Sequence, residues 1–445
     1  MKLNAENRSY FERSEVFSAD MGRVSKDTLG DWLLERIKNI PLNEKRDSYL
    51  SFGGQFRPRM ETTRHANWSR SAEANENYYS QRIQFYADVH LKKHLRFYGQ
   101  LQHGLISRKE PVYTQSDKLD LNQAFVDLTF NVTPRALLTI RTGRQEVFLG
   151  TGRLMATREG LNIRRSFDME RIIYEEKKFS SQAWYGREVR VPTGIFDNSS
   201  AHGAYTWGVY NVLKSSELVG GSTDFYYFGY KADNKYNAGG GHETRNTIGF
   251  RRSGLIANRF RYNSEVNYQF GSLADKRIRA FSIEGDWHYI KKLQETAMDY
   301  GIKLDYISGD SKVDDNHLGT FNPMFNNPAY FGLINQIAAM NMFDVHPSVE
   351  FVFRDKFKTI LEADFYWRAQ LDDGLYSSSR ALLRRGDQTN ARYIGWQPGV
   401  KLEYRFAPNL LLSSETYFFA AGRFIKQTGE SASTFYNALT LKIDL

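Results

Sequence analysis

The fold is decided by a stretch that reads IQFYADVHL at residues 83–91 and LRFYGQLQ at residues 95–102. Apolar and polar side chains alternate in both segments, beginning with Ile83 and Gln84. Only an extended strand places successive side chains on opposite faces, because a helix repeats every 3.6 residues. The stretch therefore predicts two β-strands, joined by a tight turn at residues 90–94, each with one apolar and one polar face.

The same two-residue period continues along most of the chain. Each alternating segment is about 9–12 residues long, which is the length that a tilted strand needs to cross a bilayer. Short connections at residues 90–94 and 131–135 alternate with long ones at residues 103–119, 193–203 and 309–346. We count about 16–18 strands in this pattern. Further clear segments lie at residues 49–61, 123–130, 260–270, 300–306, 357–368, 396–405 and 435–444.

Composition supports a membrane barrel. The mean hydropathy is −0.56 and no run of eighteen apolar residues occurs, which excludes a helical membrane protein. A barrel tolerates low hydropathy because half of each strand faces water. The 445 residues include 27 Tyr and 31 Phe, and this abundance suits aromatic girdles at two lipid interfaces. The chain contains no Cys. A soluble β-sandwich is the alternative, but it needs neither such long strands nor alternating loop lengths.

We therefore predict an all-β fold, a transmembrane antiparallel β-barrel of about 18 strands with long extracellular loops. Residues 48–445 form the barrel, and a barrel of this size leaves an aqueous lumen. Residues 1–47 are polar, with a helical pattern at Thr28–Ile40 that Pro41 ends. They predict a short periplasmic lead-in or plug segment. No signal-peptide pattern opens the chain, so we expect the mature form with an added start Met.

Arginine is the candidate functional residue type. The densest segment is residues 141–171, and the net charge is +9, from 60 Lys and Arg against 51 Asp and Glu. A guanidinium suits carboxylate recognition, and a set of them in a lumen would attract anions. The alternative is that these arginines only pair with acidic neighbours to hold the wall together. The acidic neighbours in the segment are Glu146, Glu159, Asp168 and Glu170.

Other motifs give weaker signals. The glycine-rich residues 150–160 lack the strand–loop–helix context and Lys-Ser/Thr ending of a nucleotide site. Residues 326–343 predict a helix after Pro328, which either folds over the mouth or is a small packing element. A loop containing Asp310, Asp314 and Asp315 is a solvated turn or a weak calcium candidate. The His residues show no zinc-ligand spacing, and we expect no cofactor.

Five segments carry a resemblance to a known family. Their order and spacing resemble the alginate-export family of outer-membrane barrels, although the chain ends in Leu445 without the terminal aromatic common in barrels. The resemblance implies a monomeric 18-stranded barrel with an electropositive lumen, and the best-known member secretes alginate. It also implies lumen or constriction roles for Arg141, Arg144, Arg158, Arg164 and Arg165. The segments are residues 39–59, 96–101, 121–128, 141–146 and 153–168.

The predicted function is a passive outer-membrane pore in a Gram-negative bacterium, with no enzymatic step. The solute is an anionic polysaccharide or oligosaccharide with carboxylates, and loops such as 309–346 gate the lumen. Expected partners are outer-membrane lipid, lipopolysaccharide and periplasmic export components, but not nucleic acid. Arginines on the inward face complete the candidate lumen set: Arg57, Arg59, Arg96, Arg141, Arg368 and Arg405.

Three alternatives remain open from the sequence. The first is a nutrient-uptake porin for small organic acids or sugars, which has the same fold. The second is a barrel enzyme that acts on lipid, for which Ser264, Ser282 and His288 are the available candidates. The third is a structural or adhesive barrel whose lumen is plugged.

Overall fold

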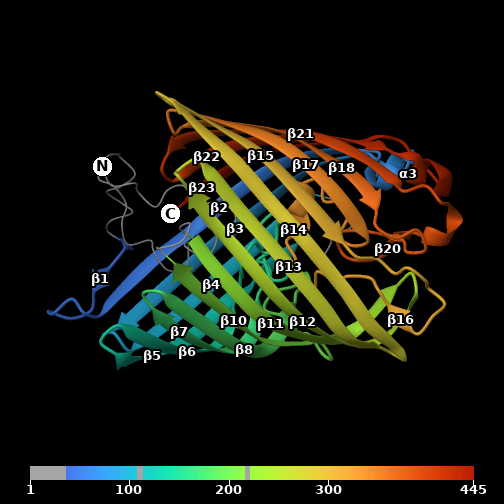
Figure 1. Ribbon diagram of the computed structural model, residues 1–445. Helices are drawn as coiled ribbons and strands as arrows, with labels where there is room; N and C mark the ends of the chain where they lie inside the picture. Colours follow the sequence, from blue (N-terminus) through green and yellow to red (C-terminus); the bar gives the residue numbers. More distant parts are fainter. Residues whose placement is uncertain (1–36, 108–113, 216–220) are drawn as a thin grey trace.

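A computed structural model describes residues 37–107, 114–215 and 221–445. These residues form a closed barrel of antiparallel strands (Figure 1). Within the described residues, no helix is both long and apolar enough to span a bilayer. Eighteen strands form the wall: β2 (Tyr49–Arg64), β3 (Glu76–Leu91), β4 (Leu95–Ile106), β5 (Asp117–Thr133), β6 (Ala136–Gln145), β7 (Phe167–Glu176), β8 (Phe179–Arg190), β10 (Tyr205–Ser215), β11 (Gly221–Tyr236), β12 (Gly239–Ile256), β13 (Phe260–Leu273), β14 (Lys276–Leu293), β15 (Thr296–Ile307), β17 (Met342–Phe353), β18 (Phe357–Arg368), β21 (Tyr393–Ala407), β22 (Leu410–Ala421) and β23 (Thr434–Asp444).

Minor elements decorate this wall. They lie at the two ends of the barrel or inside it. They are the short strands β1 (Ile40–Pro41), β9 (Ser199–Ser200), β16 (His317–Leu318), β19 (Leu375–Tyr376) and β20 (Leu382–Arg384), the helix α3 (Arg423–Thr428), and 3-10 turns at Ala66–Trp68, Ala72–Ala74, Pro328–Phe331 and Gly386–Gln388.

The first and last wall strands close the barrel. β2 pairs with β3 on one side and with β23 on the other, in a register that places Phe56 opposite Ile443 and Met60 opposite Leu439. A bilayer offers no water to satisfy backbone N–H and C=O groups, so a spanning sheet must leave no open edge. The pairing of β2 with β23 meets this requirement, and the predicted fold class is confirmed.

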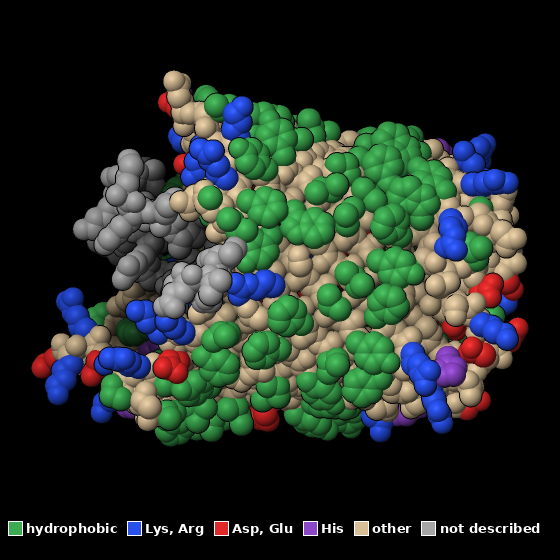
Figure 2. Space-filling model, in the orientation of Figure 1, with side chains coloured by type: hydrophobic (Ala, Val, Ile, Leu, Met, Phe, Trp, Pro, Cys, Tyr) green, Lys and Arg blue, Asp and Glu red, His purple; other side chains and the backbone are tan. Residues whose placement is uncertain are grey.

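The two faces of each strand separate as the alternation predicts. On β13, Val266 and Tyr268 point outward and are 47% and 43% exposed, whereas Glu265, Asn267 and Gln269 are buried inside. Figure 2 shows apolar side chains spread over the barrel's side and charged ones gathered towards its two ends. This is the surface of a protein that faces lipid around its middle.

The connections differ between the two ends. At one end they are tight turns, such as residues 92–94 and 134–135, and both β1 and the C-terminus lie there (Figure 1). At the other end lie the long connections, including residues 191–204, 308–341 and 369–392. Short periplasmic turns and long outer loops are typical of outer-membrane barrels, so the tight-turn end corresponds to the periplasmic side.

The predicted N-terminal segment is described only from residue 37, so most of the helical pattern at Thr28–Ile40 lies outside the described residues. The residues from Lys38 onward contact the barrel. β1 pairs with the start of β2, and the Lys38 ammonium donates hydrogen bonds to the Tyr86 hydroxyl (2.6 Å) and to the Leu445 carbonyl (3.2 Å). This lead-in therefore touches the inner wall at the tight-turn end.

Two long connections fold into the lumen. Residues 146–166, between β6 and β7, and residues 308–341, between β15 and β17, are largely buried. The prediction of a helix after Pro328 is wrong, because only a 3-10 turn forms at Pro328–Phe331. The chain then turns at Gly332, where φ is +90° and an added Cβ would lie 2.4 Å from the Tyr417 ring. Backbone contacts to neighbouring loops replace helical hydrogen bonds beyond that point.

The lipid-facing assignment can be tested on β13. We expect Val266→Arg, near the middle of the strand, to lower the free energy of unfolding in lipid vesicles by about 2–4 kcal/mol, as Arg does at a bilayer midplane. Val266→Ile should leave it nearly unchanged. Equal stability of the two variants in urea titrations would show that Val266 does not face lipid.

Candidate functional site

A carboxylate on one inward loop is the centre of the arginine network. Glu159 lies 2.6 Å from Arg82 Nη2, 3.2 Å from Arg164 Nε and 4.0 Å from Arg57 Nη1. Burial raises the pKa of Glu159, but the surrounding guanidinium groups, led by Arg82, outweigh burial and hold that pKa far below its usual range. Glu159 is therefore ionised, and three cations share its single negative charge.

The same loop is fastened to the wall through its backbone. From β2, Arg57 donates to the carbonyls of Glu159 and Leu161 (both 2.8 Å), and Arg59 donates to the carbonyl of Gly160 (2.8 Å). Both arginines face inward, as predicted. Their donors hold residues 159–161 against the inside of β2, which fixes how far this loop extends into the lumen.

Arg96 and Arg141 form a second group on the inner wall. Arg96 Nε lies 2.7 Å from Asp88, and Arg141 Nε lies 2.6 Å from Asp127. Arg96 also reaches Asp127 at 3.6 Å, and the Arg141 guanidinium stacks over the Phe125 ring at 3.9 Å. Two guanidinium groups thus share Asp127, although this group contains as many carboxylates as guanidinium groups.

Arg144 lies on the other face of the wall. It is three residues from Arg141 on β6, and an odd separation along a strand reverses the face. Its guanidinium pairs with Asp168 (2.8 Å) and donates to the Asn198 carbonyl (3.3 Å) in the loop that follows β8. Arg144 therefore does not face the lumen, although the sequence predicted that it lines the lumen together with Arg141.

Two further arginines of the first inward loop bind the wall, and one of them also joins this loop to the second. Arg158 and Arg165 both contact Glu188 on β8, at 2.6 Å and 2.9 Å. Arg165 also donates to the carbonyls of Phe325 and Asn326 in the second loop. A parallel bridge between Met155 and Phe325 lies beside these contacts, so the two loops form one body that crosses the lumen.

The last two predicted arginines lie near the ends of the barrel. Arg368, at the end of β18, is buried and donates to the carbonyls of Leu371 (2.7 Å), Gly386 (2.9 Å) and Thr389 (2.6 Å). It shapes the loop at residues 369–392 from within. Arg405, at the tight-turn end, donates to the Pro408 carbonyl (3.2 Å).

Two lumen-facing arginines, Arg82 and Arg153, were not among the residues predicted from the sequence. Arg82 carries an identifiable signal, since it sits at an inward position of the alternating stretch beside Ile83. Arg153 carries none, because it comes from a loop: it contacts Glu284, Asp305 (3.4 Å) and Glu265 (3.7 Å) on the opposite wall. Only the fold brings the loop to those strands.

The wall opposite the arginine groups is acidic. Asp305, Asp344 and Asp364 on β15, β17 and β18 are fully or almost fully buried. Among the described residues, the one group of three side chains close enough to hold a metal ion is Asp344, His346 and Asp364.

The calcium candidates Asp310, Asp314 and Asp315 are not part of this group, because they lie in the connection at residues 308–341. Burial, followed by the nearby Asp373, raises the pKa of Asp310 to about 6.

The candidates for a lipid-acting enzyme do not gather. Ser282 and His288 lie six residues apart on β14, about 20 Å at 3.3 Å per residue. His288 is held between Asp286 (2.8 Å) and Asp299 (2.7 Å). Ser264 lies on the outward face of β13.

The comparison with known families decides the identity. The sequence matches the family described as "Alginate export" over residues 48–438, which is most of the barrel. The chain belongs to the alginate export family. No curated protein sequence matches it significantly.

Solved structures of similar fold are outer-membrane porins. OpdO of Pseudomonas aeruginosa has a TM-score of 0.56 and 10% identity, over 89% of this chain and 97% of that one. A BenF-like porin from Pseudomonas fluorescens has a TM-score of 0.58 and 9% identity, over 89% and 98%. Pseudomonas aeruginosa OccK2 (OpdF), in complex with glucuronate, has a TM-score of 0.57 and 10% identity, over 88% and 98%. The family match and the shared fold together show that this member of the alginate export family is an outer-membrane porin channel.

The contact between the two loops gives a prediction. Replacing Arg165 with Gln should remove its hydrogen bonds to the carbonyls of Phe325 and Asn326; the Phe325 carbonyl keeps the Ala156 N–H as a donor, whereas the loss at Asn326 should cost about 1–3 kcal/mol. We expect larger or more frequently fluctuating single-channel conductance in planar bilayers. Arg385→Gln, at an exposed pair with Asp387, is the matched control and should leave conductance unchanged. Identical traces from both variants would mean that the loops do not limit ion flow.

Proposed function

We propose that this porin passes an anionic, carboxylate-bearing saccharide across the outer membrane of a Gram-negative bacterium by diffusion along its arginine-lined wall. Membership of the alginate export family supports a polyuronate or an oligouronate as the solute. The expected setting is a monomer in lipid and lipopolysaccharide, served by periplasmic export components.

One observation carries this proposal. On the inner side of β2–β8 and the loop at residues 146–166, ion pairs among the described residues connect seven guanidinium groups with only five carboxylates. The excess of cations leaves a positive field on that wall. Because the carboxylates are already shared, a solute carboxylate can compete for the donors of the partly exposed Arg96, Arg141 and Arg164 without an uncompensated charge being left behind. The seven are Arg57, Arg82, Arg96, Arg141, Arg158, Arg164 and Arg165.

The acidic wall opposite the arginines supports a defined path. An anion entering the lumen is attracted to the β2–β8 side and repelled from the β14–β18 side, where Glu284, Asp305 and Asp344 lie. Such a transverse field orients a charged chain and keeps it against the arginine groups. The joined loops narrow the lumen along this path, and their displacement would admit a larger solute.

The uptake alternative has a specific observation in its favour. OccK2, a structural neighbour, was solved in complex with glucuronate, which is a single uronate. A channel for monomeric organic acids or sugars needs the same positive wall but no passage wide enough for a polymer. The two functions therefore differ in the size of the solute, not in its charge.

Proteoliposomes separate the two functions. We expect efflux of a fluorescently labelled short oligouronate through the purified protein, faster than efflux of a neutral oligosaccharide of equal length. Monomeric glucuronate should pass as well. Passage of glucuronate with complete retention of the oligouronate would favour the uptake function and contradict the polymer pore.

Arg141 and Arg144 form a matched pair for testing the lumen. We expect Arg141→Gln to lower the ratio of anion to cation permeability about sevenfold, since a unit charge at about 7 Å in water contributes about 0.6 kcal/mol, with opposite sign for the two ions. Arg144→Gln removes the same charge from the outward face of the same strand and should change permeability little. Reversal potentials across a salt gradient measure both. Equal shifts in the two variants would contradict the role given to the inner wall.

A further inference from the structure

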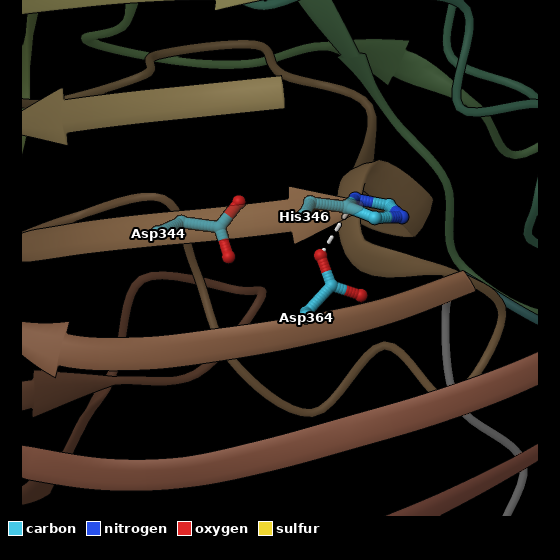
Figure 3. A group of neighbouring side chains, drawn as sticks. All are labelled: Asp344, His346 and Asp364. Carbon is cyan, nitrogen blue, oxygen red and sulfur yellow. Dashed lines mark ion pairs between the residues drawn. The ribbon is translucent and has the colours of Figure 1, made fainter. Parts of the chain in front are cut away.

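Three side chains outside the arginine network converge on the acidic wall. Asp344 and His346 lie on the inward face of β17, and Asp364 lies on the neighbouring β18, as Figure 3 shows. Their potential ligand atoms all lie within 4.8 Å of one another. Asp344 and Asp364 are fully buried, and the His346 side chain is 14% exposed.

Five of the six polar side-chain atoms of this group lack a hydrogen-bond partner, and the sixth, Asp364 Oδ2, accepts from Gln397 at 3.5 Å. Both carboxylate oxygens of Asp344, both ring nitrogens of His346 and Oδ1 of Asp364 are buried without one. Asp364 Oδ1 lies only 2.7 Å from His346 Nδ1 (dashed in Figure 3), but not in line for a hydrogen bond. Buried polar groups are almost always satisfied, and an unsatisfied carboxylate is costly. These buried atoms therefore suit a ligand that is not itself part of the protein.

Charge leads to the same conclusion. The nearest cation is Lys303 on β15, whose Nζ lies 3.8 Å from Asp344 and 3.9 Å from Asp305. Glu362 lies 3.3 Å from His346 and takes Lys401 as its own partner at 3.1 Å. Glu362 thus has Lys401 and Asp305 also has Arg153 at 3.4 Å, which leaves Asp344 and Asp364 facing the single ammonium group of Lys303. With His346 neutral, as it is when it binds a metal, this pair keeps one negative charge that a bound cation can balance.

We propose that Asp344, His346 and Asp364 bind a divalent transition-metal ion of the zinc class. One imidazole nitrogen and two carboxylate oxygens suit Zn²⁺ and related first-row ions, whereas Ca²⁺ prefers oxygen ligands alone. Three protein ligands leave a further position open to water on the lumen side, where His346 is partly exposed.

The position of the group indicates what the metal does. Pro347 has no N–H to donate, and the pairing of β17 with β18 skips from Val345 opposite Phe365 to Ser348 opposite Glu362. His346 and Asp364 face each other across that gap. A metal ion held by both strands would bridge the wall where its hydrogen-bonded ladder is interrupted.

The test is direct metal binding to the untagged full-length protein in detergent, stripped with a chelator. Titration with Zn²⁺ by calorimetry should give one equivalent, and Co²⁺ should give visible d–d absorption bands. Asp344→Asn and Asp364→Asn should each weaken binding at least tenfold. Glu350→Gln is the matched control, because it removes a carboxylate that pairs with Lys358 on the same two strands. It should bind as the unmodified protein does.

Each result decides the question. Failure of the unmodified protein to bind Zn²⁺ stoichiometrically overturns the site, whatever the variants do. Binding that persists in Asp344→Asn and Asp364→Asn overturns it as well, because the ion then sits elsewhere. If either variant fails to refold, judged by its heat-dependent mobility on gels, His346→Gln replaces it with the same expected loss.

Discussion

The closure of the sheet between β2 and β23 is the constraint on which everything else depends. A spanning sheet with an open edge would leave backbone groups unsatisfied in lipid, so eighteen strands must return to their starting point. Closure then fixes which side chains face lipid and which face the lumen. It also creates an interior too wide for wall side chains alone to fill, and the two long inward loops occupy part of it.

We propose that the loops inside the barrel convert a general pore into a selective one. Residues 146–166 are held by Arg57 and Arg59 through backbone carbonyls and by Arg82 through Glu159. Each arginine therefore positions the loop and also contributes to the field in the lumen. Pairing and anion attraction are compatible, because the carboxylates are shared among a larger number of guanidinium groups.

The sequence predicted the wall better than the interior. Alternation depends only on local geometry, so β13 and its neighbours could be assigned, along with the inward direction of Arg57, Arg96 and Arg141. The helix expected after Pro328 did not form, because that largely buried segment bonds to other loops through its backbone, as from the Ala338 N–H to the Tyr376 carbonyl. The face of Arg144 could have been obtained by counting three residues from Arg141. The partners of Arg153 and the Asp344 group could not, since they depend on contacts between strands distant in sequence.

The reversal potential of the unmodified protein in a planar bilayer, measured across a gradient of potassium chloride, tests the central claim most directly. An arginine excess on the conducting wall requires that chloride permeate faster than potassium, and that the preference weaken as salt screens the charges. Preferential permeation of potassium at low salt would contradict it, since the acidic wall would then dominate the path.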